Sequence, residues 1–441
     1  MTVDLRLSGW GRVPRPLCRV VAAADPAAAA AIAGAEPSLI ARGNGRAYGD
    51  AAANPDATLL MADCAGVEAF DPASGTLIAR AGTLLADLIA AFVPHGWFPP
   101  VAPGTGLVTL GGMIAADVHG KNHHRAGTFG THVDWIDLAT ANGSVLRCSP
   151  TAHPALFAAT CGGMGLTGVI LRASLRMLPI ETPFVRAETL RTPSLAAAMA
   201  LFEESADWTY SVAWIDCLSR GAAMGRSVLI RGEHALRVEL PRRPPRVGNR
   251  VRKVGFDLPG FALNRITVRA FNALYWAAAR PGTRIGALAP FFHPLDGILD
   301  WNRIYGRSGL FQYQCVLPLA ASEAGMTALL RRIAGHGTGS FLAVLKRFGD
   351  VPGACPGMLS FPMAGYTLAL DFRFTPGNLR LARELDAIVA DHQGRLYLAK
   401  DSRMGPEMLR FYPRLAEFRA LRAAVDPRGK FGSLLSRRLG L

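Results

Sequence analysis

The sequence predicts an α+β protein of two domains, the second built on an antiparallel sheet covered by helices. Its 441 residues exceed what one ordinary hydrophobic core accommodates. Half of them are hydrophobic and 47 are glycine, which is typical of a globular protein rather than a disordered one. Short strand-like runs, helices and glycine loops alternate up to about residue 178, and longer strand-like runs separated by helices follow.

The first part of the chain carries clear local signals. A helix is expected to begin near Pro26, because proline suits the first helical turn. Strands are expected for TLLMAD, VEAFD and TLIARAG, followed by a helix in TLLADLIAAFVPHGW that ends at Pro94 and Gly96. The run VDWIDLATANGSVLRCSP predicts two strands joined by a turn at Asn142 and Gly143.

The second part predicts a sheet with helices on one face. Its strand-like runs are AWIDCLSRGAAMGRSVLIRG, GLFQYQCVLPL, SFLAVLKRFG and GYTLALDFRF. Residues 237–253 are rich in arginine and proline, which predicts either a solvated, mobile connection or a surface that rests on anionic lipid headgroups. The final run, DPRGKFGSLLSRRLGL, is expected to be a short basic tail.

Charge and cysteine usage narrow the classes of function. The net charge is +15 and the pI about 10.1, which favours an anionic partner such as nucleic acid, anionic lipid or a phosphorylated substrate. A GC-rich genome that favours arginine gives the same balance. The arginines are dispersed and no nucleic-acid motif is present, so we expect no nucleic-acid partner.

The seven scattered cysteines form no CxxC pair, which disfavours a disulfide scaffold or a zinc module and indicates a reducing compartment. We find no secretory signal and no run long and apolar enough to cross a bilayer. The cytoplasm is the expected location.

Three glycine-rich turns indicate an extended anionic ligand such as a dinucleotide, because glycine turns free backbone N–H groups for phosphate. The GxGxxG of the third turn is not a Rossmann fingerprint, since a helix-like run precedes it and a strand-like run follows. A Walker sequence is absent as well. The turns are Gly43-Asn44-Gly45-Arg46, Gly104-Thr105-Gly106 with Gly111-Gly112, and Gly162-Gly163-Met164-Gly165 with Gly168.

A histidine cluster, HGKNHHRAGTFG, follows the second turn. His119 suits a cofactor wall, a proton-transfer group or an ordinary loop histidine. We expect no metal site, because the adjacent His123 and His124 cannot easily converge on one ion and no carboxylate or cysteine stands at ligand spacing.

Several segments carry a resemblance to a known family. ARGNGRAYGD resembles the pyrophosphate loop of the vanillyl-alcohol oxidase and p-cresol methylhydroxylase class of FAD enzymes, and PGTGLVTLGGMIAADVHGKNHHRAGTFGTHV resembles their second flavin loop. Within that class the chain is similar to the decaprenylphosphoryl-ribose oxidase family over nearly its whole length. The matching segments are, in order, LSGWGR, HGKNHH, GLTG, FHPLD, WNRIYG, FQYQ, SFP, YLAKDSR and YPR.

The resemblance implies a two-domain FAD-binding fold of the PCMH type. It implies an FAD-binding domain at residues 1–178, a substrate-binding domain at 179–394 and a C-terminal segment at 395–441 that returns to the FAD domain. The implied reaction oxidises a secondary alcohol of a polyprenyl-phosphate-linked pentose to a keto-sugar, with hydride passing to flavin N5. A separate short-chain NAD-dependent reductase would then complete an epimerisation.

The same resemblance implies a non-covalent FAD that a quinone-type acceptor reoxidises, and a peripheral contact with the inner face of the membrane. An aldonolactone or sugar-alcohol oxidase that acts on a soluble substrate and uses oxygen remains the alternative enzyme. A non-catalytic nucleic-acid-binding protein is the alternative from another class.

The resemblance also implies the cofactor contacts, in three groups. They are Arg42, Gly43, Asn44, Gly45, Arg46, Tyr48, Gly49 and Asp50; then Gly104, Thr105, Thr109, Gly111, Gly112, Ala116, His119, Gly120, Asn122 and His123; and then Gly163, Gly165, Gly168, Ile170 and Tyr397.

The catalytic residues implied are Lys400 and His119. Oxidation of an alcohol releases the hydroxyl proton, and a lysine with a lowered pKa can accept it; the alternative is a surface lysine. Gln312 and Gln314 stand two apart in an expected strand, so their amides share a face and suit sugar hydroxyls. The implied substrate residues are Tyr48, Tyr305, Gln312, Gln314, Lys346 and Thr367.

One residue departs from the family pattern. Some members have a cysteine where this chain has Ala369. The oxidation does not need that thiol, so the change bears on the shape of the pocket.

Overall fold

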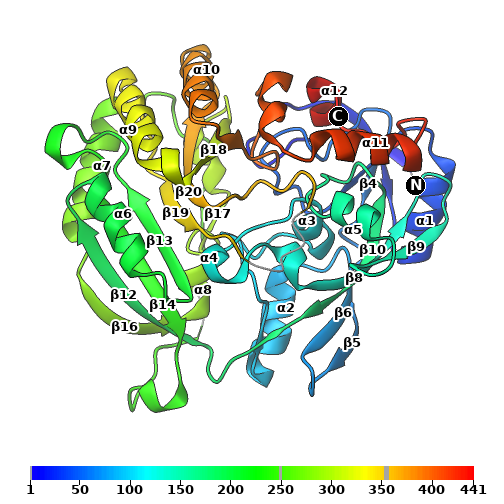
Figure 1. The fold of residues 1–441 in the computed structure, drawn as a ribbon, viewed down its shortest axis with the longest axis horizontal. Helices are drawn as coiled ribbons and strands as arrows, with labels where there is room; N and C mark the ends of the chain where they lie inside the picture. Colours follow the sequence, from blue (N-terminus) through cyan, green and yellow to red (C-terminus); the bar gives the residue numbers. More distant parts are fainter. Residues whose placement is uncertain (1, 248–250, 352–356) are drawn as a thin grey trace.

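The computed structural model describes residues 2–247, 251–351 and 357–441 (Figure 1). The chain begins with a small sheet in the order β1-β2-β4-β3, in which β2, β4 and β3 run parallel. Its helix α1 begins at the predicted Pro26, and the Asp25 side chain accepts from the backbone N–H of Ala28. These elements are β1 (Thr2–Arg6), β2 (Leu17–Ala22), α1 (Pro26–Ala35), β3 (Ile40–Arg42) and β4 (Thr58–Leu60).

A second, antiparallel sheet follows in the order β5-β6-β10-β8-β9. The predicted strand pair and its turn are confirmed, with Gly143 at φ 84° between β8 and β9. The elements are β5 (Val67–Asp71), β6 (Thr76–Arg80), α2 (Leu85–Phe92), β7 (Trp97–Phe98), α3 (Leu110–Ala115), α4 (His123–Ala126), β8 (Val133–Ala139), β9 (Val145–Cys148), α5 (Pro154–Thr160), β10 (Val169–Arg176) and β11 (Leu178–Pro179).

The largest sheet has eight antiparallel strands in the order β16-β12-β14-β13-β19-β20-β18-β21. Figure 1 shows α6, α9 and α10 packed on it. The elements are β12 (Phe184–Thr192), α6 (Leu195–Glu204), β13 (Tyr210–Ile215), β14 (Ser227–His234), α7 (Arg265–Ala278), β16 (Gly282–Ala287), α8 (Leu288–Phe292), β18 (Leu310–Pro318), α9 (Leu319–His336), β19 (Ala343–Phe348), β20 (Gly365–Arg373), α10 (Pro376–Asp391) and β21 (Arg395–Leu396).

The side chains of strand β20 point alternately to the two faces of this sheet. Leu368 and Leu370 are fully buried in the core cluster that includes α9 and α10. Thr367 and Asp371 point to the opposite face, because side chains alternate along a strand. That second face meets the glycine loops of the N-terminal part, so the site lies between the sheet and the loops.

The C-terminal run is folded rather than the expected basic tail. It follows α11 (Leu415–Val425) and forms α12 (Leu434–Leu439), in which Leu435 and Leu439 are fully buried. Figure 1 places both helices beside the N-terminal strands. The arginines of this run suggested a solvated tail. The run folds instead because the leucines of α12 are buried against the rest of the protein.

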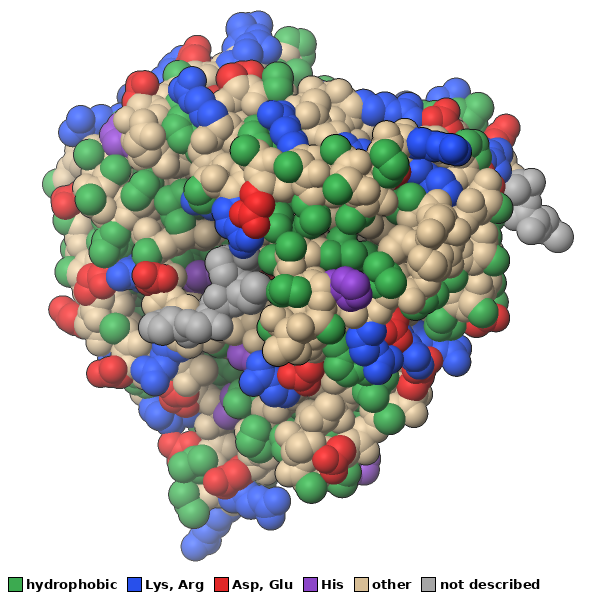
Figure 2. Space-filling view, turned by 45° about the vertical axis from the view of Figure 1, so that its right-hand side comes forward, with side chains coloured by type: hydrophobic (Ala, Val, Ile, Leu, Met, Phe, Trp, Pro, Cys, Tyr) green, Lys and Arg blue, Asp and Glu red, His purple; other side chains and the backbone are tan. Residues whose placement is uncertain are grey.

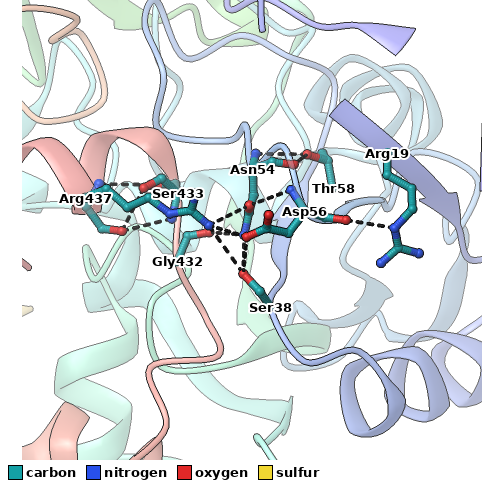
Figure 3. A network of polar contacts seen from close by, with 9 residues as sticks. Arg19, Ser38, Asn54, Asp56, Thr58, Gly432, Ser433 and Arg437 are labelled. Carbon is teal, nitrogen blue, oxygen red and sulfur yellow. Dashed lines mark hydrogen bonds and ion pairs between the residues drawn. The ribbon is translucent and has the colours of Figure 1, made fainter. Parts of the chain in front are cut away.

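A polar network joins this end to the N-terminal sheet (Figure 3). The Asn54 amide donates to the Gly432 carbonyl at 2.8 Å, and Arg437 donates to Asn54 Oδ1 at 3.0 Å and pairs with Asp56 at 2.5 Å. Leu39 and Phe431 add an isolated β-bridge. The first and last segments of the chain therefore form one packed unit.

The basic segment at 237–253 contains more structure than the expected mobile loop. It begins with the 3-10 turn Arg237–Glu239, and its end, β15 (Arg252–Lys253), pairs in parallel with β17 (Ile298–Leu299). The expected basic residue Arg250 lies outside the described residues, as does Cys355. Figure 2 shows lysine and arginine side chains dispersed among acidic ones over one face of the molecule. Within the described residues, no helix has the length and apolar character needed to span a bilayer.

Candidate active site

The first glycine loop, residues 42–50, exposes a run of unused backbone donors. Among the described residues, no hydrogen bond from the N–H groups of Gly43 to Ala47 is present. Gly45 has φ 63°, and a Cβ on Gly43 would overlap the Thr109 hydroxyl, so both positions require glycine. Such a row of free N–H groups suits a phosphate.

The charged side chains of this loop have two different surroundings. Arg42 donates to the Ser8 carbonyl at 2.7 Å, and Asp50 pairs with Arg438 at 2.9 Å, so both anchor the loop to the protein. Arg46 stacks over Trp10 at 4.3 Å, its Nε is buried without a partner, and burial lowers its pKa. A half-buried guanidinium whose Nε has no hydrogen-bond partner fits a site that binds a negatively charged ligand.

The second loop packs directly beside the first. Asn44 donates to the Leu107 carbonyl at 2.8 Å, and the Thr109 hydroxyl caps α3 by accepting from Gly112 N at 3.2 Å. A Cβ on Gly104 would meet nothing within 4 Å, so that residue borders open space. Gly111 lies against Ala81.

Asp296 is a residue of this region that sequence reasoning did not select. It accepts from the Thr105 hydroxyl at 2.6 Å and from Gly106 N at 2.7 Å, so it fixes the second loop from outside. The signal was present, since Asp296 ends the FHPLD segment.

The third loop is a packing element rather than an open cradle. Met164 N donates to the Ala115 carbonyl at 2.8 Å, which joins this loop to the end of α3. Gly163 closely approaches Ala159, and Gly168 approaches Ala139. The neighbouring residues Gly165, at φ 78°, and Ile170, buried in β10, complete this junction.

The histidine segment anchors the site by several different contacts. Asn122 donates to the Pro100 carbonyl at 2.8 Å, and its Oδ1 lies close to where a Cβ on Gly120 would stand. His123 packs on Phe348 at 4.3 Å between ring centroids, and Lys121 binds the Phe291 carbonyl. No cluster of three metal-binding side chains occurs within residues 2–247, 251–351 and 357–441.

His119 lies at the centre of the site. Its Nδ1 is 3.0 Å from Lys346 Nζ and its Nε2 is 3.1 Å from the Gln314 amide nitrogen. Burial, followed by the Lys346 charge, holds the pKa of His119 well below its usual range, so the ring is neutral. When Nδ1 accepts from Lys346, Nε2 carries the hydrogen and can donate to the Gln314 oxygen after an amide flip.

Lys346, one of the implied substrate residues, lies against His119. Burial, followed by the charges of Lys121 and Lys400, lowers the pKa of Lys346 to about 7. Lys346 is directly opposite Thr367 in the β19–β20 ladder, which explains why the two share a face.

A second polar group lies on the same face of the sheet, around Asp371. Gln312 donates to Asp371 Oδ1 at 2.7 Å and to the Tyr48 hydroxyl at 3.3 Å. Asp371 is fully buried, and burial raises its pKa to about 7. Sequence reasoning missed Asp371, although its position four residues after Thr367 places it on the same face. The expectation that Gln312 and Gln314 share a face is confirmed.

Lys400 completes this group from the C-terminal part of the chain. Its Nζ lies 4.2 Å from the Tyr48 ring centroid. Burial lowers the pKa of Lys400 to about 8, while the Asp371 carboxylate opposes this shift. The acid and the lysine therefore both titrate near neutral pH, which is the range useful for proton transfer.

Strand β21 ends at Leu396, and both Tyr397 and Lys400 lie in the turn that follows. The Tyr397 hydroxyl donates to the Ala116 carbonyl at 2.9 Å. Tyr48 N donates to the Ala399 carbonyl at 3.0 Å, and Gly49 closely approaches the Asp401 backbone. This turn therefore lies directly on the first glycine loop.

An aromatic wall closes the other side. Tyr305 stacks on Phe341 with centroids 5.6 Å apart, and it joins Tyr48 and Trp301 in one buried cluster. Ala369 lies opposite Gln314 in the β18–β20 ladder, so its small side chain faces the site.

The residues present fit FAD. The free N–H groups of the first loop and the guanidinium of Arg46, whose Nε has no partner, can hold the pyrophosphate, and the open side of Gly104 leaves room beside them. The neutral His119 contacts the polar face of β18 and β20 beside these loops.

Comparisons with known proteins agree with this geometry. Residues 17–149 match the family described as an FAD binding domain. The chain is 38% identical to decaprenylphosphoryl-beta-D-ribose oxidase of Mycolicibacterium smegmatis, over 100% of this chain and 98% of that protein. It is 40% identical to an uncharacterized protein of the mprA 5′ region of Streptomyces coelicolor, over 81% of this chain and 99% of the relative. L-gulonolactone oxidase of Bos taurus is 32% identical over 31% of each chain.

The loops, the site and the matched domain define an FAD-dependent oxidoreductase, and the matched domain fits the PCMH-type fold. FAD is its cofactor. The identity extends over the whole chain, and the chain belongs to the decaprenylphosphoryl-β-D-ribose oxidase family.

Proposed function

We propose that this enzyme oxidises a secondary alcohol of a polyprenyl-phosphate-linked pentose, with decaprenylphosphoryl ribose as the reference substrate, to a keto-sugar. The observation that carries the proposal is the 38% identity to an oxidase of that name over the whole chain. The site supports it, because the amides of Gln312 and Gln314 on one face suit the hydroxyls of a sugar.

Each polar group of the site then has a chemical task. Bound FAD supplies the acceptor for the hydride. Lys400 accepts the hydroxyl proton when it is neutral, and Asp371 holds the charge that forms on Lys400. Gln312 orients Asp371, and His119 lies between Lys346 and Gln314 as a neutral wall. Tyr305 and Thr367 line the remaining sides.

We further propose the two-domain organisation set out from the sequence. Residues 1–178 and 395–441 would form the FAD domain, and residues 179–394 the substrate domain. The bridge between Leu39 and Phe431 supports this division. Strand β21, at the start of the last segment, pairs with β18 and would link the two domains.

The wider setting is also a proposal. The keto-sugar would pass to a short-chain NAD-dependent reductase that completes an epimerisation, and a quinone-type acceptor would reoxidise the flavin. The enzyme would work in the cytoplasm at the inner face of the membrane. FAD would be bound without a covalent link, so acid precipitation should release all yellow colour into the supernatant.

A turnover experiment separates the candidates. FAD-loaded protein is incubated with detergent-dispersed decaprenylphosphoryl ribose, free ribose or an aldonolactone, each with an artificial acceptor or with oxygen. We expect turnover with the lipid-linked sugar and the artificial acceptor. Turnover of the lactone with oxygen would instead support the soluble-substrate oxidase, which the partial match to L-gulonolactone oxidase favours.

A further inference from the structure

The outer side of α7 and the loop before it carry large apolar side chains in contact with solvent. Ile266 is 79% exposed and Leu274 71% exposed, and they lie eight residues apart on one side of the helix. Phe256 and Phe261, in the preceding loop, are 65% and 78% exposed. The opposite side of α7 already packs on the protein, because Val268 is buried in the core and Asn272 donates to Asp216 at 2.9 Å. Figure 1 shows α7 at the left edge of the molecule, away from the FAD-binding loops.

The sequence that leads into and through α7 is strongly basic. Residues 237–284 contain eleven arginines and lysines but only two acidic residues, Glu239 and Asp257. Glu239 already pairs with Arg186 at 2.8 Å, and Asp257 with Arg12 at 2.6 Å. Arg265 and Arg269 lie on α7 itself, next to the apolar side chains, and both are exposed. An apolar helix side flanked by unneutralised arginines complements an anionic lipid surface.

An aromatic path connects this surface to the active site. The ring of Phe271, on α7, lies 5.7 Å from Phe341, and Phe341 stacks on Tyr305. Leu263, in the loop before α7, packs against the cluster of Tyr305 and Tyr48. Apolar contacts therefore run without a break from the outer side of α7 to the aromatic wall of the active site.

We propose that α7 and the loop at residues 256–264 form a membrane-docking surface for anionic lipid, and that the prenyl chain of the substrate passes along Phe271 and Phe341 to reach Tyr305. The prenyl-chain part rests on the proposed function. The docking part does not, because binding to vesicles can be measured without substrate.

The test is flotation of the FAD-loaded full chain with vesicles of phosphatidylcholine alone, or of phosphatidylcholine with phosphatidylglycerol. The parent should bind the vesicles that contain phosphatidylglycerol more tightly than those of phosphatidylcholine alone. The variant Ile266→Ser/Leu274→Ser should lose at least about tenfold in partition, because it removes two aliphatic side chains that would be buried in the bilayer on docking. The variant Arg265→Gln/Arg269→Gln should lose about 25-fold on anionic vesicles only, since each basic residue contributes about fivefold.

Matched controls carry the same substitutions at exposed positions elsewhere. These are Leu17→Ser/Leu319→Ser for the apolar pair and Arg380→Gln/Arg383→Gln for the basic pair, and both should bind as the parent does. FAD content and melting temperature confirm that each variant is folded.

Three results would overturn the proposal. They are a parent that binds neither vesicle, α7 variants that bind as the parent does, and controls that lose as much as the α7 variants. If the parent binds no vesicles but forms oligomers through α7, this surface is an interface between copies of the protein, and the lipid assignment is refuted. The α7 variants should turn over detergent-dispersed substrate at the rate of the parent. If the parent itself does not turn over this substrate, the proposed function fails, whatever the vesicles show.

Discussion

Two adjacent arginines of α12 are expected to contribute very differently to the stability of the protein. Arg438 pairs with Asp50 and with Asp401, each at 2.9 Å, and both acids are almost fully buried. Arg437 pairs with Asp56 at 2.5 Å, but both partners are about half exposed. We therefore expect Arg438→Met to destabilise the protein far more than Arg437→Met, although both remove one arginine from the same helix.

The magnitudes follow from burial. Removing one partner of a buried ion pair costs about 3–5 kcal/mol, because the other charge is left unpaired. Arg438 is 25% exposed, so we lower the expected loss for Arg438→Met to about 2–4 kcal/mol. Arg437→Met should cost about 1 kcal/mol or less, as exposed pairs do.

The assay is urea unfolding of the FAD-loaded protein, followed by tryptophan fluorescence, with flavin release recorded in parallel. Since Asp401 directly follows Lys400, Arg438→Met should also reduce turnover, while Arg437→Met should not. Equal losses of unfolding free energy in the two variants would refute the assignment of Arg438 as the anchor of the C-terminal segment.

Three further predictions concern the site. Lys400→Met should lower kcat by about 10²-fold or more with FAD content unchanged, because the proton acceptor is lost; turnover within a few-fold of the parent would contradict this role. Asp371→Asn should lower the pKa of Lys400 below its value of about 8, because the carboxylate that favours the charged lysine is gone. The acid limb of the kcat/KM profile should then move to lower pH, and a shift to higher pH would be inconsistent with a neutral lysine as base. Gly43→Ala should reduce the affinity for FAD, because the new Cβ would overlap the Thr109 hydroxyl. Titration with FAD measures this affinity, and a value equal to that of the parent would contradict the requirement for glycine at this position.

Local patterns in the sequence predicted much of the N-terminal part. The proline start of α1, the turn at Gly143 and the glycine loops depend on the residue types themselves, so they could be read without tertiary information. The helix that precedes Gly163 and the strand that follows Gly168 likewise excluded a Rossmann loop correctly.

The contacts of the site depend on pairing between distant strands. Asp371 meets Gln312 only because β18 and β20 pair in that register, and nothing local to Asp371 indicates its buried partner. Lys346 meets His119 because β19 lies beside the histidine segment, and nothing in the sequence around Lys346 indicates this contact. The C-terminal run looked like a tail because its arginines outnumber its acids, whereas burial of Leu435 and Leu439 decides its fold.

The most direct test of the account is anaerobic reduction of the bound flavin. Decaprenylphosphoryl ribose is added to the FAD-loaded protein without oxygen, and the visible flavin absorbance is recorded. We expect the absorbance to bleach with one equivalent of the lipid-linked sugar, and to do so about 10²-fold or more faster in the parent than in Lys400→Met. Bleaching by free sugars or lactones, with none by the lipid-linked sugar, would contradict the proposed function.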